Sequence, residues 1–288
     1  GENEPGTTPG ENEPGTTPGG NKPGTTPGGN KPGTTPGDTL SDLTPEQKEK
    51  VNRIAKELNI PVQTAKKLQE MAQKFGIEID TLLLTDQDIL NQKSEGDVKG
   101  SSFSKIRAKA AKVKKNRITV KWNKVKWADG YQIYAGKCGK NNKYKLLKTI
   151  KKVSTTSFTY KKLKKGTGYK FIVKAYKNVD GKKYTVAASK NVHEVTLGGK
   201  RTNPKSVKVK KKTVKIKKRK KFTIKSKIVK ASSRKKLLNH RKLSYESTNK
   251  KIATVSRKGV IRGKKKGTCY VYIYAENGVF KKVKVTVK

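Results

Sequence analysis

This chain of 288 residues is poor in the side chains on which most enzymes rely. It has two cysteines, two histidines, two tryptophans and one methionine. Cys138 and Cys269 lie in different β-rich parts of the chain, which predicts neither a disulfide within a domain nor a metal cluster. No apolar run approaches the ~20 residues that a membrane-spanning helix needs. We therefore expect no catalytic, cofactor-binding or metal-binding residues.

Acidic side chains are scarce after Gly100, which limits general acid-base chemistry. The five that remain there are Asp129, Asp180, Glu194, Glu246 and Glu276. Asp129 and Asp180 each precede a glycine, a pair that is typical of a turn. His193 precedes Glu194, but no nucleophile or third partner is spaced to join it. We interpret Cys138 as a free thiol and Cys269 as a small core residue.

Positive charge, in contrast, is abundant and unevenly placed. Residues 1–100 contain 11 basic and 16 acidic side chains, whereas the rest of the chain contains 60 basic and five acidic ones. The electrostatic field of this excess positive charge attracts polyanions of almost any kind, including nucleic acid, teichoic acid, sulfated glycan and anionic membrane. Charge therefore predicts the class of partner without choosing among these.

Residues 1–37 repeat a nine-residue unit, with PGTTPG beginning at Pro5, Pro14, Pro23 and Pro32. The repeat has no aromatic or large aliphatic side chain to bury, and its proline and glycine content favours an extended, disordered stalk. It is similar to linkers between modules in secreted and surface proteins of Gram-positive bacteria. The chain begins at Gly1 and its only methionine is Met71, so we expect a fragment or a processed product.

Residues 38–93 show helical periodicity. Thr44 begins a capping box with proline at the first helical position, and apolar residues recur behind it at helical spacing. A second helix is predicted to follow Pro61 and to end at Gly76. A third, short helix is predicted after Thr85. These helices are expected to form a small structural bundle.

The two longer predicted helices also resemble a helix-turn-helix. Residues 54–68, IAKELNIPVQTAKKL, have the small residue, the leucine and the turn of such a motif. Any tight pair of packed helices needs a similar spacing. Between Asp38 and Gly100 the acidic residues outnumber the basic ones, 12 to 9. Since neutralisation of phosphate dominates DNA binding, a structural role is favoured over DNA recognition.

After a linker at 94–101, residues 102–197 carry a β pattern. Its segments are Ile118 to Trp122, Gly130 to Tyr134, Leu163 with Gly166 and Thr167, and Tyr169 to Ala175. They resemble the strands of a fibronectin type III domain, which implies a buried Trp122 and a corner where the Tyr169 phenol bonds to nearby backbone. The integrin-binding sequence Arg-Gly-Asp of that family is absent, so no such activity is implied.

Beyond a hinge at 198–205, residues 206–288 form the last predicted domain. β-branched residues first alternate with lysines, and four short motifs follow: Ser247 to Asn249, Ala253 to Val255, Gly259 to Ile261, and Gly267 with Thr268. Their order and spacing resemble a bacterial Ig-like domain of group 2. The predicted fold is mainly β, with two tandem Ig-like sandwiches preceded by a small helical segment and the disordered repeat.

The strand from Thr268 to Ala275 alternates strictly between two faces. Cys269, Val271, Ile273 and Ala275 are predicted to face the core. The tyrosines are predicted to face solvent, where they would stack on sugar rings while nearby lysines hold anionic groups. This predicts a ligand-binding patch made of Tyr270, Tyr272, Tyr274, Lys264, Lys265 and Lys266. The alternative is ordinary packing of the rings beneath lysine stems.

Together these patterns predict a non-catalytic extracellular module, located at the cell surface or cell wall of a Gram-positive bacterium and acting in adhesion, wall association or spacing. The expected partner is an anionic polysaccharide or teichoic acid, with a host surface glycan or protein as a second class, and the chain is expected to be monomeric. One alternative is the accessory C-terminal region of a secreted enzyme, such as a glycoside hydrolase or protease, whose catalytic domain lies outside this chain. A second alternative is a nucleic-acid-binding protein.

Overall fold

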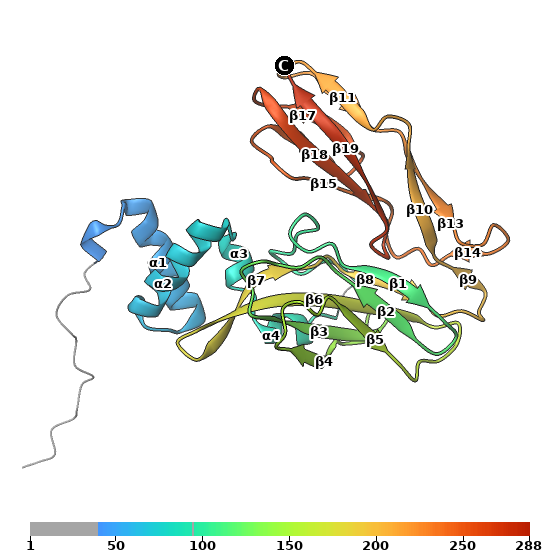
Figure 1. Cartoon of the computed structure of the whole chain (residues 1–288), viewed down its shortest axis with the longest axis horizontal. Coiled ribbons are helices and arrows are strands. Elements are labelled where there is room, and N and C mark those ends of the chain that lie inside the picture. Colours follow the sequence, from blue (N-terminus) through green and yellow to red (C-terminus); the bar gives the residue numbers. More distant parts are fainter. Residues whose placement is uncertain (1–39, 94) are drawn as a thin grey trace, which may run out of the picture. The chain divides into compact units, whose positions relative to one another are not determined.

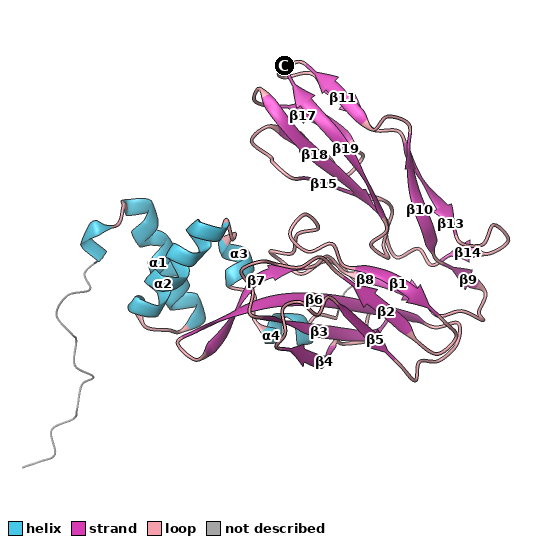
Figure 2. Cartoon of the chain, in the orientation of Figure 1, coloured by secondary structure: helices cyan, strands magenta, loops and turns pink. Residues whose placement is uncertain are grey.

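The structure is a computed structural model that describes residues 40–93 and 95–288, so the predicted stalk at 1–37 lies outside the described residues. Helices occupy the N-terminal part of the described chain and strands occupy the rest (Figure 2). The helical elements are η1 (Leu40–Asp42), α1 (Pro45–Leu58), α2 (Val62–Phe75), α3 (Ile79–Leu82) and α4 (Asp86–Leu90).

The ends of the helices follow the capping chemistry that the sequence predicts. Thr44 caps α1 through a complete capping box with Gln47, and Thr85 caps α4 in the same way with Asp88. Gly76 ends α2 with a φ of 61°, a conformation that glycine adopts without steric cost. The helices of the N-terminal segment therefore start and stop where local sequence dictates.

The helical segment does not form a separate bundle. Ile54 and Leu68 are fully buried in a core that continues into the sandwich at 102–197. Phe75 of α2 stacks on Trp127 at a centroid distance of 5.5 Å, and α3 packs against a strand of that sandwich. A segment of this size buries only a modest share of its surface by itself, and the shared core adds to the apolar surface that its helices bury.

The first sandwich pairs two antiparallel sheets (Figure 1). Its strands are β1 (Lys109–Val113), β2 (Ile118–Lys121), β3 (Gly130–Lys137), β4 (Lys145–Ile150), β5 (Ser157–Tyr160), β6 (Gly168–Val179), β7 (Lys182–Ala188) and β8 (Val192–Val195). One sheet has the order β1-β2-β5, and the other has the order β4-β3-β6-β7, with β8 also paired to β6. Side chains from the facing sides of both sheets fill the space between them.

Two predicted features of this sandwich are confirmed. Trp122 is buried and meets Tyr131 edge to face at 5.3 Å. The backbone N–H of Lys164 donates to the Tyr169 phenol oxygen at 3.0 Å, which forms the predicted tyrosine corner. That hydrogen bond ties the turn before β6 to the strand itself.

We expect Tyr169→Phe to lower the free energy of unfolding by about 1 kcal/mol, because the substitution leaves the Lys164 N–H without its acceptor. Denaturant unfolding followed by fluorescence measures the change. The matched control is Tyr160→Phe on β5, which removes the same atom from a half-buried ring. Equal losses in the two variants would show that the corner hydrogen bond contributes nothing of its own.

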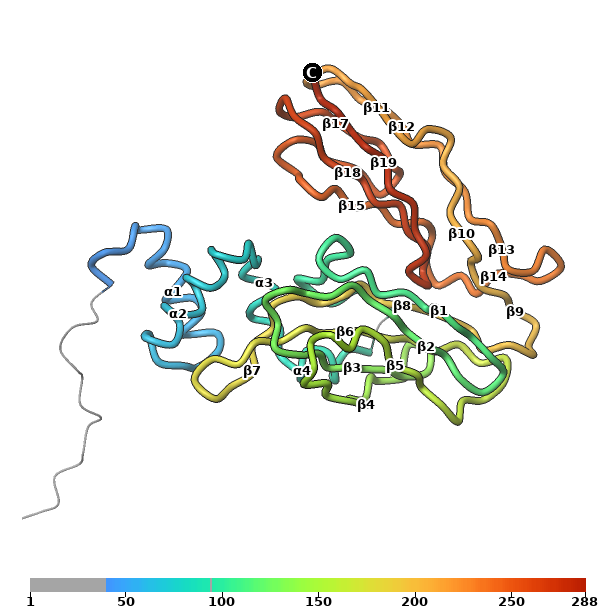
Figure 3. The backbone as a smooth tube through the Cα atoms, in the orientation of Figure 1, coloured from blue at the N-terminus to red at the C-terminus, as the bar shows by residue number. Residues whose placement is uncertain are grey.

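The second sandwich begins directly after the first (Figure 3). Its strands are β9 (Arg201–Thr202), β10 (Pro204–Val209), β11 (Thr213–Ile216), β12 (Lys221–Thr223), β13 (Ser226–Lys230), β14 (Lys236–Leu237), β15 (Ser244–Ser247), β16 (Ala253–Val255), β17 (Val260–Gly263), β18 (Gly267–Tyr274) and β19 (Phe280–Val287). The main sheets have the orders β11-β19-β18-β15 and β12-β17-β16, while β10 pairs with β13 and β9 with β14.

The predicted core face of β18 is confirmed. Cys269, Val271, Ile273 and Ala275 are at most 3% exposed and pack with apolar residues of β11 and β19. On β11 and β19, exposed lysines alternate with buried valine and isoleucine, an arrangement in which the ammonium groups stay in water. This alternation allows so basic a chain to bury an apolar core.

The segments predicted as linker and hinge are anchored by specific contacts. In the linker, Val98 is buried and the Asp97 carboxylate accepts from the Asn191 N–H at 2.9 Å. In the hinge, the Asn203 side chain accepts from the Val195 N–H at 2.8 Å and donates to the Val195 carbonyl at 2.7 Å. These bonds hold both connecting segments to the first sandwich.

The N-terminal segment of the first sandwich also contacts the second sandwich. Phe103 is 1% exposed and lies flat against Tyr274 at a centroid distance of 4.1 Å. The Glu246 carboxylate accepts hydrogen bonds from the backbone N–H groups of Phe103 and Ser104, both at 2.9 Å. Apolar stacking and a well-satisfied carboxylate therefore join the two sandwiches at this point.

Candidate functional site

The basic surface after Gly100 has few acidic partners to neutralise it. Asp129 accepts from Lys177, and Asp180 from Thr64 and Lys67. The other three acids are held internally: Glu246 by the segment at Phe103, Glu276 by the His240 N–H, and Glu194 by burial. Of the 60 basic residues in this region, only Lys170 and Lys174 are buried. Most of the positive charge is therefore displayed without a counter-charge.

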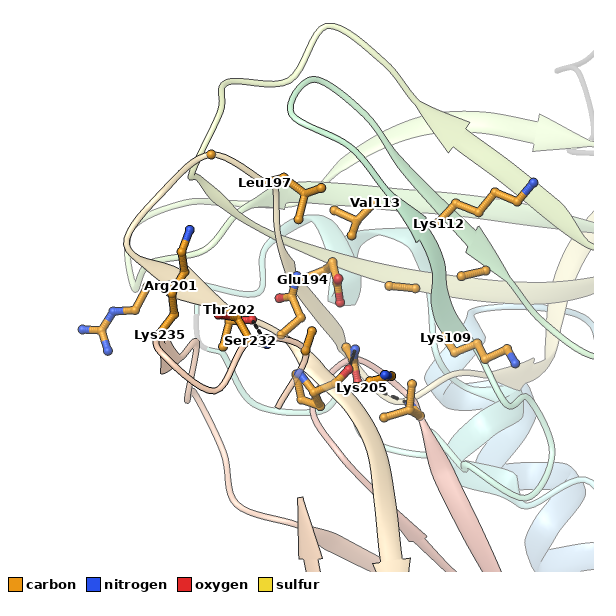
Figure 4. A pocket seen from close by; sticks show the side chains of 18 of the residues that line it. Lys109, Lys112, Val113, Glu194, Leu197, Arg201, Thr202, Lys205, Ser232 and Lys235 are labelled. Carbon is orange, nitrogen blue, oxygen red and sulfur yellow. Dashed lines mark hydrogen bonds between the residues drawn. The ribbon is translucent and has the colours of Figure 1, made fainter. Parts of the chain in front are cut away.

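Part of this charge surrounds a pocket of about 670 Å³ at the meeting of the two sandwiches. Figure 4 shows residues of β1 on one side and residues of β9, β10 and the loop after β13 on the other. Six exposed basic residues line it: Lys109, Lys112, Lys121, Arg201, Lys205 and Lys235. None of the six has an ion-pair partner among the described residues.

Backbone contacts hold two of these side chains at the pocket rim. The Lys235 ammonium donates to the Gly199 carbonyl at 2.6 Å, and the Arg201 guanidinium donates to the Leu237 carbonyl at 3.3 Å. The first contact connects the turn before β9 to the loop between β13 and β14, and the second connects β9 to β14. The hydrogen bonds use neutral acceptors, so the positive charge of both groups stays available to a ligand.

Among the described residues, the one acidic side chain that lines the pocket is Glu194, which is 3% exposed. Burial, with a smaller contribution from the nearby Glu276 carboxyl, raises the pKa of Glu194 to about 8, against the opposing hydrogen bonds of Asn277 and Asn203. At neutral pH the Glu194 carboxyl is therefore mostly protonated. Its presence adds little negative charge to the pocket.

The prediction that all three tyrosines of β18 face solvent is wrong for Tyr274, which is 3% exposed beneath Phe103. Tyr272 is half-buried and meets Phe103 edge to face at 5.6 Å. Tyr270 is also half-buried, with the Lys282 ammonium 4.3 Å from its ring centroid. The alternation of β18 correctly placed the tyrosines on the face opposite the core, but the segment at Phe103 from the first sandwich covers much of that tyrosine face.

Lys264, Lys265 and Lys266 are exposed in the turn between β17 and β18. This turn precedes the start of β18, whereas Tyr274 ends the strand. At about 3.3 Å per residue, Lys266 and Tyr274 lie roughly 26 Å apart. The six predicted ligand-binding residues therefore do not converge on one small ligand, and Tyr270 is the ring nearest the lysines in the strand.

The structure gives His193 partners that the sequence did not predict. The Cys138 sulfur lies 3.5 Å and a Glu95 carboxylate oxygen 3.0 Å from His193 Nδ1, and His240 approaches the same carboxylate oxygen at 4.0 Å. These residues lie far apart in the sequence, so no spacing motif could have found them. Burial raises the pKa of the Cys138 thiol well above its ordinary value, with a contribution from Glu95, so this thiol is not an activated nucleophile.

The face of α2 that a helix-turn-helix would present to DNA is partly occupied. The Thr64 hydroxyl donates to the Asp180 carboxylate at 2.9 Å, and the Lys67 ammonium does so at 3.0 Å. Asp180 lies in the turn between β6 and β7. The N-terminal half of α2 is therefore engaged with the first sandwich.

The two sheets of each β domain, with the buried Trp122, the tyrosine corner and the alternating strand β18, define tandem Ig-like β-sandwiches. Residues 104–191 match the family model of the fibronectin type III domain, and residues 202–287 match that of the bacterial Ig-like domain (group 2). Both resemblances noted from the sequence are thereby confirmed. The two matches lie side by side along the chain.

Solved structures similar to part of this chain include two fibronectin type III domains. The FN5 domain of Drosophila Lar is 24% identical, with a TM-score of 0.26, over 32% of this chain and 92% of that one. The third fibronectin III domain of human KIAA0343 protein is 20% identical, with a TM-score of 0.27, over 32% of this chain and 79% of that one. A comparison with curated proteins found no match.

Both families are typical of non-catalytic surface or accessory modules and of extracellular proteins. Each matched family is a β-sandwich family, and neither is catalytic. Within residues 40–93 and 95–288, no helix has the length and apolar character needed to cross a membrane. These findings define the kind of module but not its ligand. The feature that bears on the ligand is the charged surface.

Proposed function

We propose that this chain is a non-catalytic extracellular module that holds anionic polymers through its basic sandwiches. The observation that carries the proposal is the basic pocket lined by Lys109, Lys112, Lys121, Arg201, Lys205 and Lys235. Its cations lack acidic partners among the described residues, so a bound polyanion would meet little competition. Clustered cations that border a concave surface concentrate field and favour anionic ligands.

The proposed ligand class is a repeating polyanion, such as a wall teichoic acid or a sulfated host glycan. Exposed lysines continue from the pocket along β10, and further exposed lysines lie on β11 and β12. An extended ligand can therefore contact the pocket and the adjoining strands together. The repeat at 1–37 supports a setting in a surface or secreted protein of a Gram-positive bacterium, where a stalk would separate modules.

Retention of the full chain on immobilised heparin, and on purified cell walls that carry teichoic acid, should fall steeply as salt rises from 0.05 to 1 M. The physical reason is that screening shortens to about 3 Å at 1 M, which removes most of the attraction between exposed charges. Elution with a salt gradient measures this. Retention on both matrices that is unchanged in 1 M salt would contradict the charge mechanism.

Two triple variants with equal charge change locate the binding surface. One carries Lys109→Glu, Lys112→Glu and Lys205→Glu in the pocket, and the other carries glutamate at 264–266 in the turn before β18. We expect the pocket variant to elute at lower salt than the turn variant, because the pocket brings cations from both sandwiches to one place. Identical elution of the two variants would assign binding to diffuse charge and not to the pocket.

An accessory role in a secreted enzyme is the second candidate, because both matched families are typical of such modules. In that role the same basic surface would hold an enzyme near an anionic polymer. The discriminating observation is whether the complete gene product contains a catalytic domain besides this chain. A nucleic-acid-binding role has weaker support, because the face of α2 is engaged with Asp180. A gel shift with duplex DNA tests it.

A further inference from the structure

Four side chains with the chemistry of metal ligands meet at the junction of the sandwiches. Glu95, Cys138, His193 and His240 each offer one ligand atom, and these atoms all lie within 4.8 Å of one another. The separations include 3.5 Å from the Cys138 sulfur to His193 Nδ1 and 3.0 Å from that nitrogen to Glu95 Oε2. A tetrahedral zinc ion with bonds of 2.0–2.3 Å requires ligand atoms roughly 3.3–3.7 Å apart.

The geometry favours a common ion over a catalytic triad. In a triad, the histidine uses one ring nitrogen toward the nucleophile and the other toward the carboxylate. Here the Cys138 sulfur and Glu95 Oε2 both approach the same atom, His193 Nδ1. A sulfur, a nitrogen and an oxygen that converge in this way surround a point, as ligands of a metal ion do.

Backbone contacts hold each of the four residues in place. The Cys138 N–H donates to the Gly168 carbonyl at 2.9 Å, at the end of β3. The His193 N–H on β8 donates to the Glu276 carbonyl at 2.8 Å, and the His240 N–H donates to the Glu276 carboxylate at 2.7 Å. Glu276 therefore positions both histidines.

Glu95 is held in a comparable way from the other side. Its Oε1 accepts a hydrogen bond from the Gly139 N–H, which directly follows Cys138. Its Oε2 is buried and lies 3.0 Å from His193 Nδ1 and 4.0 Å from His240 Nδ1, so it faces both histidines. One oxygen thus fixes the carboxylate, and the other remains available as a ligand.

Two nearby positive charges oppose a bound cation, and one of them, the Arg241 guanidinium beside His193, is paired with the Asp97 carboxylate at 2.8 Å. The Lys170 ammonium is fully buried, lies 3.8 Å from Glu95 Oε1, and has no hydrogen-bond partner among the described residues. Zinc bound to one thiolate and one carboxylate forms a neutral unit, so the added charge is offset by the ligands themselves. The Cys138 thiol must release its proton to the solvent when it binds the ion.

We propose that Glu95, Cys138, His193 and His240 form a structural zinc site. The four ligands come from the segment after α4, the end of β3, β8 and the loop between β14 and β15. A bound ion would tie the second sandwich to the first sandwich and to the connecting segment at 95–97. Cysteine with histidine and one carboxylate suits Zn²⁺ better than Mg²⁺ or Ca²⁺, which prefer oxygen ligands.

The test is a titration of the full chain, without a histidine tag and with its cysteines reduced, with ZnCl₂ by calorimetry and with CoCl₂ by absorption. We expect one Zn²⁺ per chain, a higher melting temperature with zinc, and a thiolate-to-Co²⁺ charge-transfer band. Cys138→Ser and His240→Ala should each weaken zinc binding at least about 100-fold, since loss of an outer-shell partner alone costs 10 to 100-fold. The exposed His240 makes the second variant safe for folding.

Cys269→Ala is the matched control, because Cys269 is the other free thiol and lies in the core of the second sandwich. Its zinc affinity and its charge-transfer band should equal those of the unmodified chain. The proposal is overturned if the chain takes up no Zn²⁺ at micromolar concentration, if Co²⁺ binds without the thiolate band, or if both ligand variants bind as the control does. Retention on heparin is measured separately and does not decide this question.

Discussion

Phe103→Ala should lower the free energy of unfolding by about 3–5 kcal/mol, the range for removing a fully buried aromatic ring. Phe103 is 1% exposed and contacts Tyr272, Tyr274 and Phe280 with its ring. These partners belong to the second sandwich, whereas Phe103 belongs to the first. The substitution therefore opens a cavity at the junction and weakens the coupling between the two domains.

Two probes can distinguish this coupling from a local cavity. Both tryptophans, Trp122 and Trp127, lie in the first sandwich, so their fluorescence reports on that domain, while far-UV circular dichroism reports on the whole chain. In Phe103→Ala the two unfolding transitions should separate. Phe222→Ala, at a half-buried ring within the second sandwich, is the control and should cost less. Coincident transitions in Phe103→Ala, with a loss no greater than the control, would refute the coupling.

Asp86→Asn should lower the free energy of unfolding by about 3 kcal/mol at pH 7. The Asp86 carboxylate on α4 forms an ion pair with Lys174, which is 2% exposed, and accepts from the Tyr134 phenol at 2.6 Å and from Gln132 at 3.0 Å. Loss of the carboxylate charge leaves a buried ammonium without a counter-charge, which costs 3–5 kcal/mol when burial is complete. We expect the lower end of this range of unfolding free energies because the Asp86 side chain is 41% exposed.

This loss should depend on pH in a defined direction. Burial alone would raise the pKa of Asp86, but hydrogen bonds from Lys174 and Tyr134, together with the Lys174 charge, outweigh it and hold the pKa below its ordinary 3.8. A carboxyl whose pKa is lower in the folded state stabilises the fold above the unfolded pKa, and that contribution disappears as pH falls through the folded pKa. The difference between Asp86→Asn and the unmodified chain should therefore be largest near neutral pH and shrink below pH 3.8.

Denaturant unfolding at several pH values measures this dependence. The matched control is Asp42→Asn, because the Asp42 carboxylate is 67% exposed in its pair with Lys66 and solvent-exposed charges contribute little. We expect a much smaller loss in that variant than in Asp86→Asn. A loss in Asp86→Asn that stays constant from pH 7 to pH 2.5 would show that the charge of Asp86 is not what stabilises the docked helix.

Local patterns in the sequence predicted the secondary structure and both domain families well. The capping box at Thr44 depends on residues three apart, and the strict alternation of β18 depends on residues two apart. Interactions between residues so close in the sequence depend on the local sequence alone. The families followed because their strands and turns occur in a fixed order along the chain.

The same patterns could not predict what covers each face. The alternation of β18 separated its tyrosines from the core, but it could not show that Phe103 packs on Tyr274 from another domain. Helical periodicity likewise found α1 and α2 without indicating that they share a core with the first sandwich. Contacts of this kind join residues from separate segments, and the periodicity of a single segment does not predict them.

The sequence alone therefore determined a mainly β chain with tandem Ig-like sandwiches, a strongly basic surface and no local motif for catalysis. Only the tertiary structure decided where that charge gathers and which rare side chains meet. It brought six basic residues around one pocket, and it brought Cys138, His193 and His240 together with Glu95. The physical reason is that packing and hydrogen bonding between distant segments determine which residues become neighbours. The spacing of these residues along the chain does not determine it.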